Sequence, residues 1–103
     1  MATIKIAASE IEGPFLVKVG TFDGGQKNLT VPTLKDASYA VKGFIWDDRV
    51  RSSDWHGGEV VRDDGTGDVV AVVSYNGRVW GAKAHPTDPW HVPDKALEFD
   101  LDA

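Results

Sequence analysis

Two segments of this 103-residue chain carry side chains that suit the binding of a polar ligand. In each of them an aspartate comes shortly before a tryptophan, and a histidine follows the tryptophan directly. An indole offers a flat apolar face to a sugar ring, a carboxylate accepts hydrogen bonds from hydroxyl groups, and an imidazole donates or accepts them. The candidate ligand-binding residues are Asp54, Trp55 and His56 in the first segment and His85, Asp88, Trp90 and His91 in the second.

The segment 85–95 is the stronger candidate of the two. Its three prolines restrict the backbone before a ligand arrives, so binding should lose less conformational entropy there than in the segment 47–57, which has no proline. We predict that Trp90 contacts a carbohydrate or another small polar ligand and that Asp88 or His91 supplies hydrogen bonds. The alternative is that each tryptophan only caps one end of the core.

Strand counting places the two segments at opposite ends of the fold. If successive strands alternate in direction, the connection at 47–57 falls at one end of the molecule and the connection at 85–95 at the other. We therefore do not expect the two segments to build a single site.

Metals, cofactors and catalysis have little support in the sequence. The chain has no cysteine, which excludes thiolate zinc ligands, disulfides and cysteine nucleophiles. A zinc site of His56, His85 and His91 would need segments from opposite ends, and the acidic turn at 63–68 lacks the full set of ligands of a calcium-binding loop. We expect no metal, no cofactor and no assigned catalytic residue. An enzyme that uses a histidine of the segment 85–95 with an aspartate as an acid–base pair is an alternative.

The composition restricts the partners and the location. A net charge of −5 without any basic run argues against nucleic acid and against an anionic membrane as partner. The N-terminal residues lack the apolar core of a signal peptide, and no apolar run approaches the length of a membrane span, so we expect a soluble cytoplasmic protein. The same composition is compatible with a protein partner or a homo-oligomer.

The strongest structural signal is the dipeptide Asn76-Gly77 between two apolar runs, which predicts a β-hairpin over 68–84. With these two residues as the loop, Val73 pairs with Trp80, and both residues lie on the same face. Both faces of the hairpin are apolar, so we expect it to lie centrally in the fold.

The remaining pattern predicts an all-β fold over residues 1–103: a single-domain antiparallel β-sandwich or closed β-barrel of about seven to nine short strands. The segment 38–46 is predicted to be one of these strands, and no segment shows a helical period. The residues predicted to be buried are Ile4, Ile6, Val17, Val19, Tyr39, Val41, Ile45, Val73, Leu97, Phe99 and Leu101, and those predicted to be exposed are Lys5, Lys18, Lys42, Glu98 and Asp100.

Three functions remain compatible with the sequence. The first is a non-enzymatic, lectin-like binding module that holds its ligand in one tryptophan-bearing loop. The second is a structural or protein-interaction module, such as an assembly or inhibitor protein, in which the loop tryptophans anchor an interface. The third is the small enzyme described above. The sequence favours the first.

Overall fold

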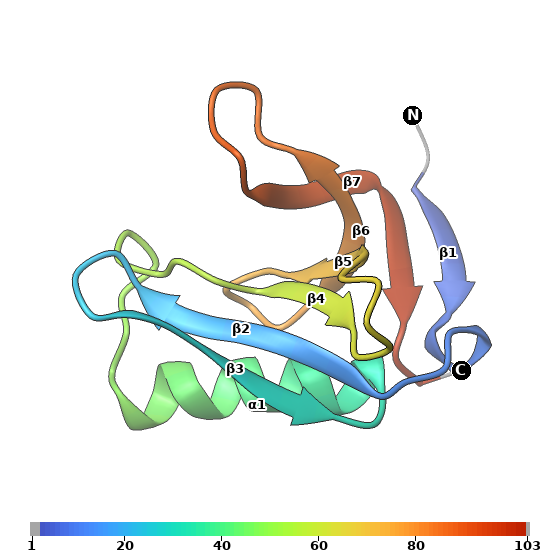
Figure 1. Ribbon diagram of the computed structural model, residues 1–103, viewed down its shortest axis with the longest axis horizontal. Helices are drawn as coiled ribbons and strands as arrows, with labels where there is room; N and C mark the ends of the chain where they lie inside the picture. Colours follow the sequence, from blue (N-terminus) through green and yellow to red (C-terminus); the bar gives the residue numbers. More distant parts are fainter. Residues whose placement is uncertain (1–2, 103) are drawn as a thin grey trace.

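The computed structural model describes residues 3–102, which form a mixed β-sheet of seven strands and one α-helix, α1, packed against it (Figure 1). The order of strands across the sheet is β1-β7-β6-β5-β4-β2-β3; β1 and β7 are parallel and the other pairs are antiparallel. The β-rich prediction is confirmed, but the sheet does not close into a barrel. The elements are β1 Ile4–Ala7, the 3₁₀ turn η1 Ala8–Glu10, β2 Phe15–Thr21, β3 Gly25–Val31, α1 Leu34–Asp47, β4 Glu59–Arg62, β5 Val69–Val73, β6 Val79–Ala84 and β7 His91–Asp100.

The predicted strand at 38–46 is wrong, because this segment belongs to the helix α1. Val41 and Ile45 are four residues apart and share a face in a helix as well as in a strand, so alternation does not distinguish the two. The start of the helix does distinguish them: the side chain of Thr33 accepts a hydrogen bond from the backbone N–H of Asp36, as an N-cap residue does. Leu34, Ala37 and Val41 then recur at helical spacing and are buried.

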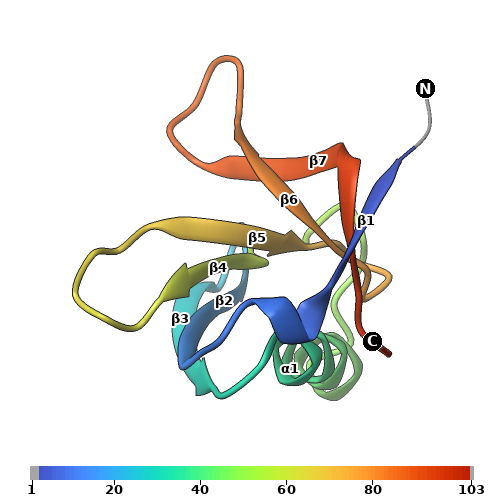
Figure 2. The same cartoon turned by 90° about the vertical axis from the view of Figure 1, so that its right-hand side faces the viewer.

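The core lies between α1 and the sheet, which curves over the helix (Figure 2). Of the residues predicted to be buried, Val17, Val19, Val41, Val73 and Phe99 are buried, and Ile6, Ile45, Leu97 and Leu101 are half-buried against them. Ile4 and Tyr39 are exposed instead, because Ile4 lies on the edge strand β1 and Tyr39 on the solvent side of α1. Of the residues predicted to be exposed, Lys5, Lys42 and Asp100 are exposed, Lys18 is half-buried and Glu98 is buried.

The strands β5 and β6 form the predicted hairpin, but the predicted register is wrong by one residue. Val73 pairs with Val79, and the loop has three residues rather than two, closed by the N–H of Ser74 donating to the carbonyl of Arg78 at 2.8 Å. Gly77 has a φ of 87°, which fits the left-handed position that follows a turn in a three-residue hairpin loop. As a result, Trp80 lies opposite Val72 and turns away from α1, not toward the core cluster.

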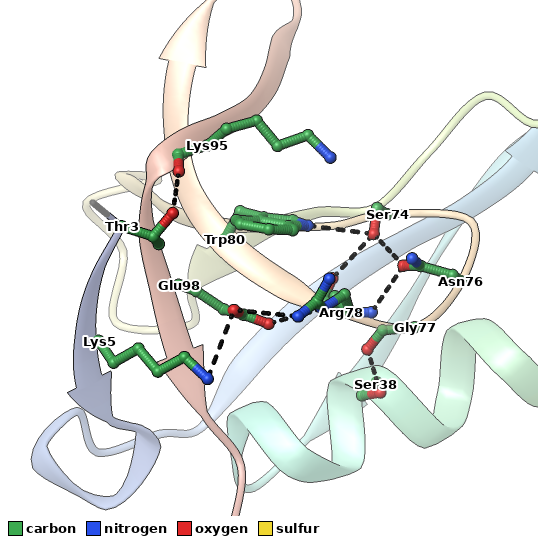
Figure 3. A network of polar contacts seen from close by, with 10 residues as sticks. All are labelled: Thr3, Lys5, Ser38, Ser74, Asn76, Gly77, Arg78, Trp80, Lys95 and Glu98. Atoms are coloured by element: carbon green, nitrogen blue, oxygen red, sulfur yellow. Dashed lines mark hydrogen bonds and ion pairs between the residues drawn. The ribbon is translucent and has the colours of Figure 1, made fainter. Parts of the chain in front are cut away.

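Glu98 is buried because it lies beside Trp80 on the sheet face opposite α1 (Figure 3). Arg78 donates to its carboxylate at 2.8 Å, and the ammonium group of Lys5 lies 3.9 Å away. The indole N–H of Trp80 donates to Ser74 at 3.2 Å, and the ammonium group of Lys95 lies 4.3 Å from the centre of the ring. This polar network covers one part of the face that α1 leaves open.

The long strand β7 bends where its pairing with β6 changes register. Trp80 pairs with Glu98, whereas Gly81 pairs with Asp94, so 95–97 have no partner in β6. Residues 81–94, which we call the arm, project from the sheet on the side away from α1 (Figure 1). The segment 85–95 was expected to be an irregular loop throughout, but only 85–90 is a loop and the rest belongs to β7.

Gly58 provides a test of this packing. Its φ is 95°, and a Cβ atom at this position would lie 2.1 Å from the carbonyl oxygen of Val73. Gly65 has a similar φ of 88° but no atom within 4 Å of the same position, so it is a matched control. We expect Gly65→Ala to lower the free energy of unfolding by about 1 kcal/mol through backbone strain, and Gly58→Ala to lower it by about 3 kcal/mol or more. Urea denaturation measures both changes in the free energy of unfolding. Equal changes in the two variants would contradict the close contact between Gly58 and β5.

Candidate functional site

The two tryptophan-bearing segments, expected at opposite ends of the fold, lie against each other. The ring of His56 lies 5.4 Å from the ring of Trp90, centre to centre, at an angle of 76°. Strand counting assumes straight strands, whereas here the sheet curves and β7 bends, so the arm returns to the neighbourhood of the earlier segment. The expectation that the two segments lie at opposite ends is therefore wrong.

Four aromatic rings form a continuous series, which we call the ring array: Phe22, His56, Trp90 and His85. Phe22 stacks on His56 with ring centres 4.4 Å apart and planes only 4° from parallel. The ring of His56 also makes the edge-on contact with Trp90, and the ring of His85 lies 4.6 Å from that of Trp90. Aromatic pairs attract each other at these separations. The array therefore joins the end of β2, the segment 54–57 and the arm.

Backbone hydrogen bonds to β2 hold the segment 54–57. The N–H of His56 donates to the carbonyl of Gly20 at 3.1 Å, and the N–H of Phe22 donates to the carbonyl of Asp54 at 3.1 Å. The side chain of Gln26 also donates to the carbonyl of His56 at 2.7 Å. Trp55 packs against the core, with its ring 6.2 Å from that of Phe44. Trp55 thus anchors the segment, and its fixed backbone sets the direction of His56.

The loop of the arm is closed by its own hydrogen bonds. The N–H of His85 donates to the carbonyl of Trp90 at 2.8 Å. The N–H of Thr87 donates to Nδ1 of His85 at 3.2 Å, which requires the neutral tautomer that carries its proton on Nε2. The carboxylate of Asp88 lies 3.4 Å from the same nitrogen and accepts a hydrogen bond from the hydroxyl group of Thr87 at 3.1 Å. These contacts fix Trp90 at the base of the loop.

His91 contacts a buried carboxylate that the sequence analysis did not single out. Its Nδ1 lies 3.1 Å from Oε2 of Glu59, a residue only 9% exposed, and Nζ of Lys18 lies 3.6 Å from Oε1. In the neutral imidazole, an Nδ1–H that donates to this carboxylate leaves Nε2 as an acceptor. An imidazole held in this way can accept a hydrogen bond from a ligand or act as a base. The carboxylate of Asp88 lies near His85, but Nδ1 of His85 accepts from Thr87 and does not donate to that carboxylate. His91 contacts a glutamate instead of the expected aspartate.

A hollow of about 220 Å³ lies between the arm and the segment 54–57. We call it the aromatic hollow; it is lined by Phe22, Trp55, His56, Trp90, His91 and the end of β5. Of the seven candidate residues, four line it, and Asp54, His85 and Asp88 do not. Phe22 and Glu59 are the participants that sequence reasoning missed. Phe22 could have been identified in the sequence as a large aromatic residue directly after a predicted strand. No feature of the sequence could have identified Glu59. Within residues 3–102, no three side chains of the metal-binding types come together.

Comparison with known protein families, with curated proteins and with solved structures finds no match for this chain.

The contact between Phe22 and His56 can be measured as a coupling energy. Stacked aromatic pairs contribute about 0.5–1.5 kcal/mol beyond the area that they bury. Phe22 is 59% exposed, so we expect a value at the lower end of that range. The coupling energy is obtained from a double-mutant cycle that compares Phe22→Ala, His56→Ala and the double variant. Urea denaturation measures the free energy of unfolding of each protein. Strictly additive losses would mean that the two rings do not stack in solution.

Proposed function

We propose that this protein is a non-enzymatic binding module and that its aromatic hollow holds a small polar ligand with a flat apolar face, such as a single sugar ring. The proposal is based on the contact between His56 and Trp90. These residues come from segments far apart in the sequence, and both line one concave surface. A ligand site needs a tryptophan that is partly accessible in a hollow, and Trp90 is half-buried there. The imidazoles beside it supply hydrogen bonds.

The size of the hollow limits the ligand. Pockets that enclose drug-sized molecules occupy about 300–1,000 Å³. The aromatic hollow, at about 220 Å³, is smaller and open to solvent. It suits one ring or a terminal group rather than an enclosed oligomer.

The side chains of the site are held in place before a ligand binds. The backbone of the segment 54–57 is hydrogen-bonded to β2, and that of the loop 85–90 is closed on itself and contains Pro86 and Pro89. His91 is held by Glu59. Ordering of loops and side chains opposes binding by about 0.5–1.5 kcal/mol per immobilised side chain, so a preformed site retains more of the contact energy.

The test is a titration with a panel of monosaccharides and disaccharides, in which isothermal calorimetry measures the binding of each sugar. We expect Trp90→Ala and His56→Ala to weaken the binding of a sugar at least tenfold, about 1.4 kcal/mol, because the ring surface is lost. The matched control is Trp46→Ala, which removes a tryptophan that is 83% exposed and lies outside the aromatic hollow. Circular dichroism verifies that each variant is folded. Binding that survives in folded Trp90→Ala, or a panel without a single binder, would contradict the proposal.

A further inference from the structure

A second and larger hollow lies at the C-terminal end of α1. Its volume is about 660 Å³, and Lys42, Ile45, Trp46, Arg49, Val50 and Tyr75 line it together with Asp47. We call it the helix-end hollow. We propose that it is a docking site for an acidic segment of a partner protein that carries an aromatic or aliphatic anchor residue. This inference goes beyond the binding of a small ligand in the aromatic hollow and does not depend on it.

The apolar part of the helix-end hollow is both exposed and rigid. Trp46 is 83% exposed, although it is the largest side chain on α1. Tyr75 donates from its hydroxyl group to the carbonyl of Val50 at 2.7 Å, so the wall formed by the hairpin is fixed to the floor formed by the end of the helix. Tryptophan, tyrosine and arginine are the residues that most often dominate the binding energy of protein interfaces. All three types meet at this hollow.

The charge of the hollow determines the charge of the partner. Its lining contains two cationic side chains, Lys42 and Arg49, and one anionic side chain, Asp47, whereas the whole chain has a net charge of −5. Among the described residues, neither cation forms an ion pair within the chain. The side chain of Lys42 lies against Gly77, and its ammonium group is 5.8 Å from the centre of the ring of Tyr39. Two cations beside an apolar surface complement a segment with carboxylates next to an apolar anchor.

Arg49 occupies a backbone position that is unfavourable for arginine. Its φ is 53°, in the left-handed region, and it follows the last turn of α1, where the N–H of Val50 donates to the carbonyl of Ile45 at 3.0 Å. Glycine or asparagine is usual at this position, and another residue there costs about 1 kcal/mol. Backbone strain of this kind is concentrated at functional sites in proteins. Arg49 is one of the residues that line the hollow.

The same charges argue against a second copy of the chain as the occupant. In a two-fold contact each copy presents the same patch, and two patches that each carry two cations and one anion repel on balance. An acidic segment of a different protein avoids this repulsion.

The experiment uses fluorescein-labelled synthetic peptides and fluorescence anisotropy. One peptide consists of glutamates and aspartates around a central Leu-Phe pair; a second has alanines in place of that pair, and a third has lysines in place of the acidic residues. We expect the first peptide alone to bind. Trp46→Ala and Lys42→Glu should weaken its binding at least tenfold, and added salt should weaken it further. Lys35→Glu, a matched charge reversal on α1 outside this hollow, should leave binding within twofold.

Two further variants separate the proposal from its alternatives. Arg49→Gly should weaken peptide binding while raising the melting temperature, so that a loss of binding cannot reflect unfolding. Trp90→Ala should leave peptide binding unchanged, which separates the helix-end hollow from the aromatic hollow. The proposal is wrong if the basic peptide binds as well as the acidic one, or if Trp46→Ala has no effect. It is equally wrong if sedimentation shows a dimer that Trp46→Ala dissociates, or if only anionic phospholipid vesicles bind.

Discussion

The sheet buries apolar side chains on both of its faces, and α1 covers only one face. The other face carries Val72 and Trp80, which are almost completely buried although no helix lies over them. Burying a large apolar side chain stabilises a protein by about 1.5–3 kcal/mol, so there is a strong driving force to cover this face. The arm, which begins at the bend of β7, lies on this side of the sheet, and its Trp90 and His91 line the aromatic hollow together with Val72. The position of the candidate site follows from this bend, because the arm carries Trp90 and His91.

One of the two buried carboxylates on this face makes the position of the arm more specific. Glu59 and Glu98 are each 9% exposed, and a buried carboxylate without partners would cost several kcal/mol. The carboxylate of Glu98 pairs with Arg78. The carboxylate of Glu59 has two partners, His91 from the arm and Lys18 from β2. An arm displaced by one residue would leave Glu59 with one partner fewer. The contact that stabilises the fold therefore also fixes an imidazole at the rim of the aromatic hollow.

The sequence predicted the parts of the structure that depend on local patterns. The dipeptide Asn76-Gly77 predicted the hairpin, but it is compatible with loops of two or three residues. The side chain of Asn76 accepts from the N–H of Arg78 at 3.1 Å within the longer loop, and this local contact accompanies the observed register. The helix was missed because its apolar residues include β-branched and aromatic types that also favour strands. The capping pair Thr33 and Asp36 was the signal that would have corrected this.

The candidate site was predictable in its residue types but not in its assembly. Tryptophan and histidine in two polar segments identified four of the residues that line the aromatic hollow. Their contact depends on the bend of β7 and on the curvature of the sheet, and both result from packing between residues far apart in the sequence. The pairing of His91 with Glu59 spans 32 positions and has no local signature. Only the folded structure shows that the two segments form one surface.

The contact between His56 and Trp90 joins the arm to the rest of the site, and the proposed function depends on it. Nuclear Overhauser spectroscopy of the uniformly labelled protein tests it directly, through cross-peaks between the ring protons of these two residues. With ring centres 5.4 Å apart and an edge-on geometry, the account predicts clear cross-peaks and upfield-shifted ring protons where one residue's edge points at the other's ring face. The absence of cross-peaks, together with unshifted proton resonances for both rings, would contradict it.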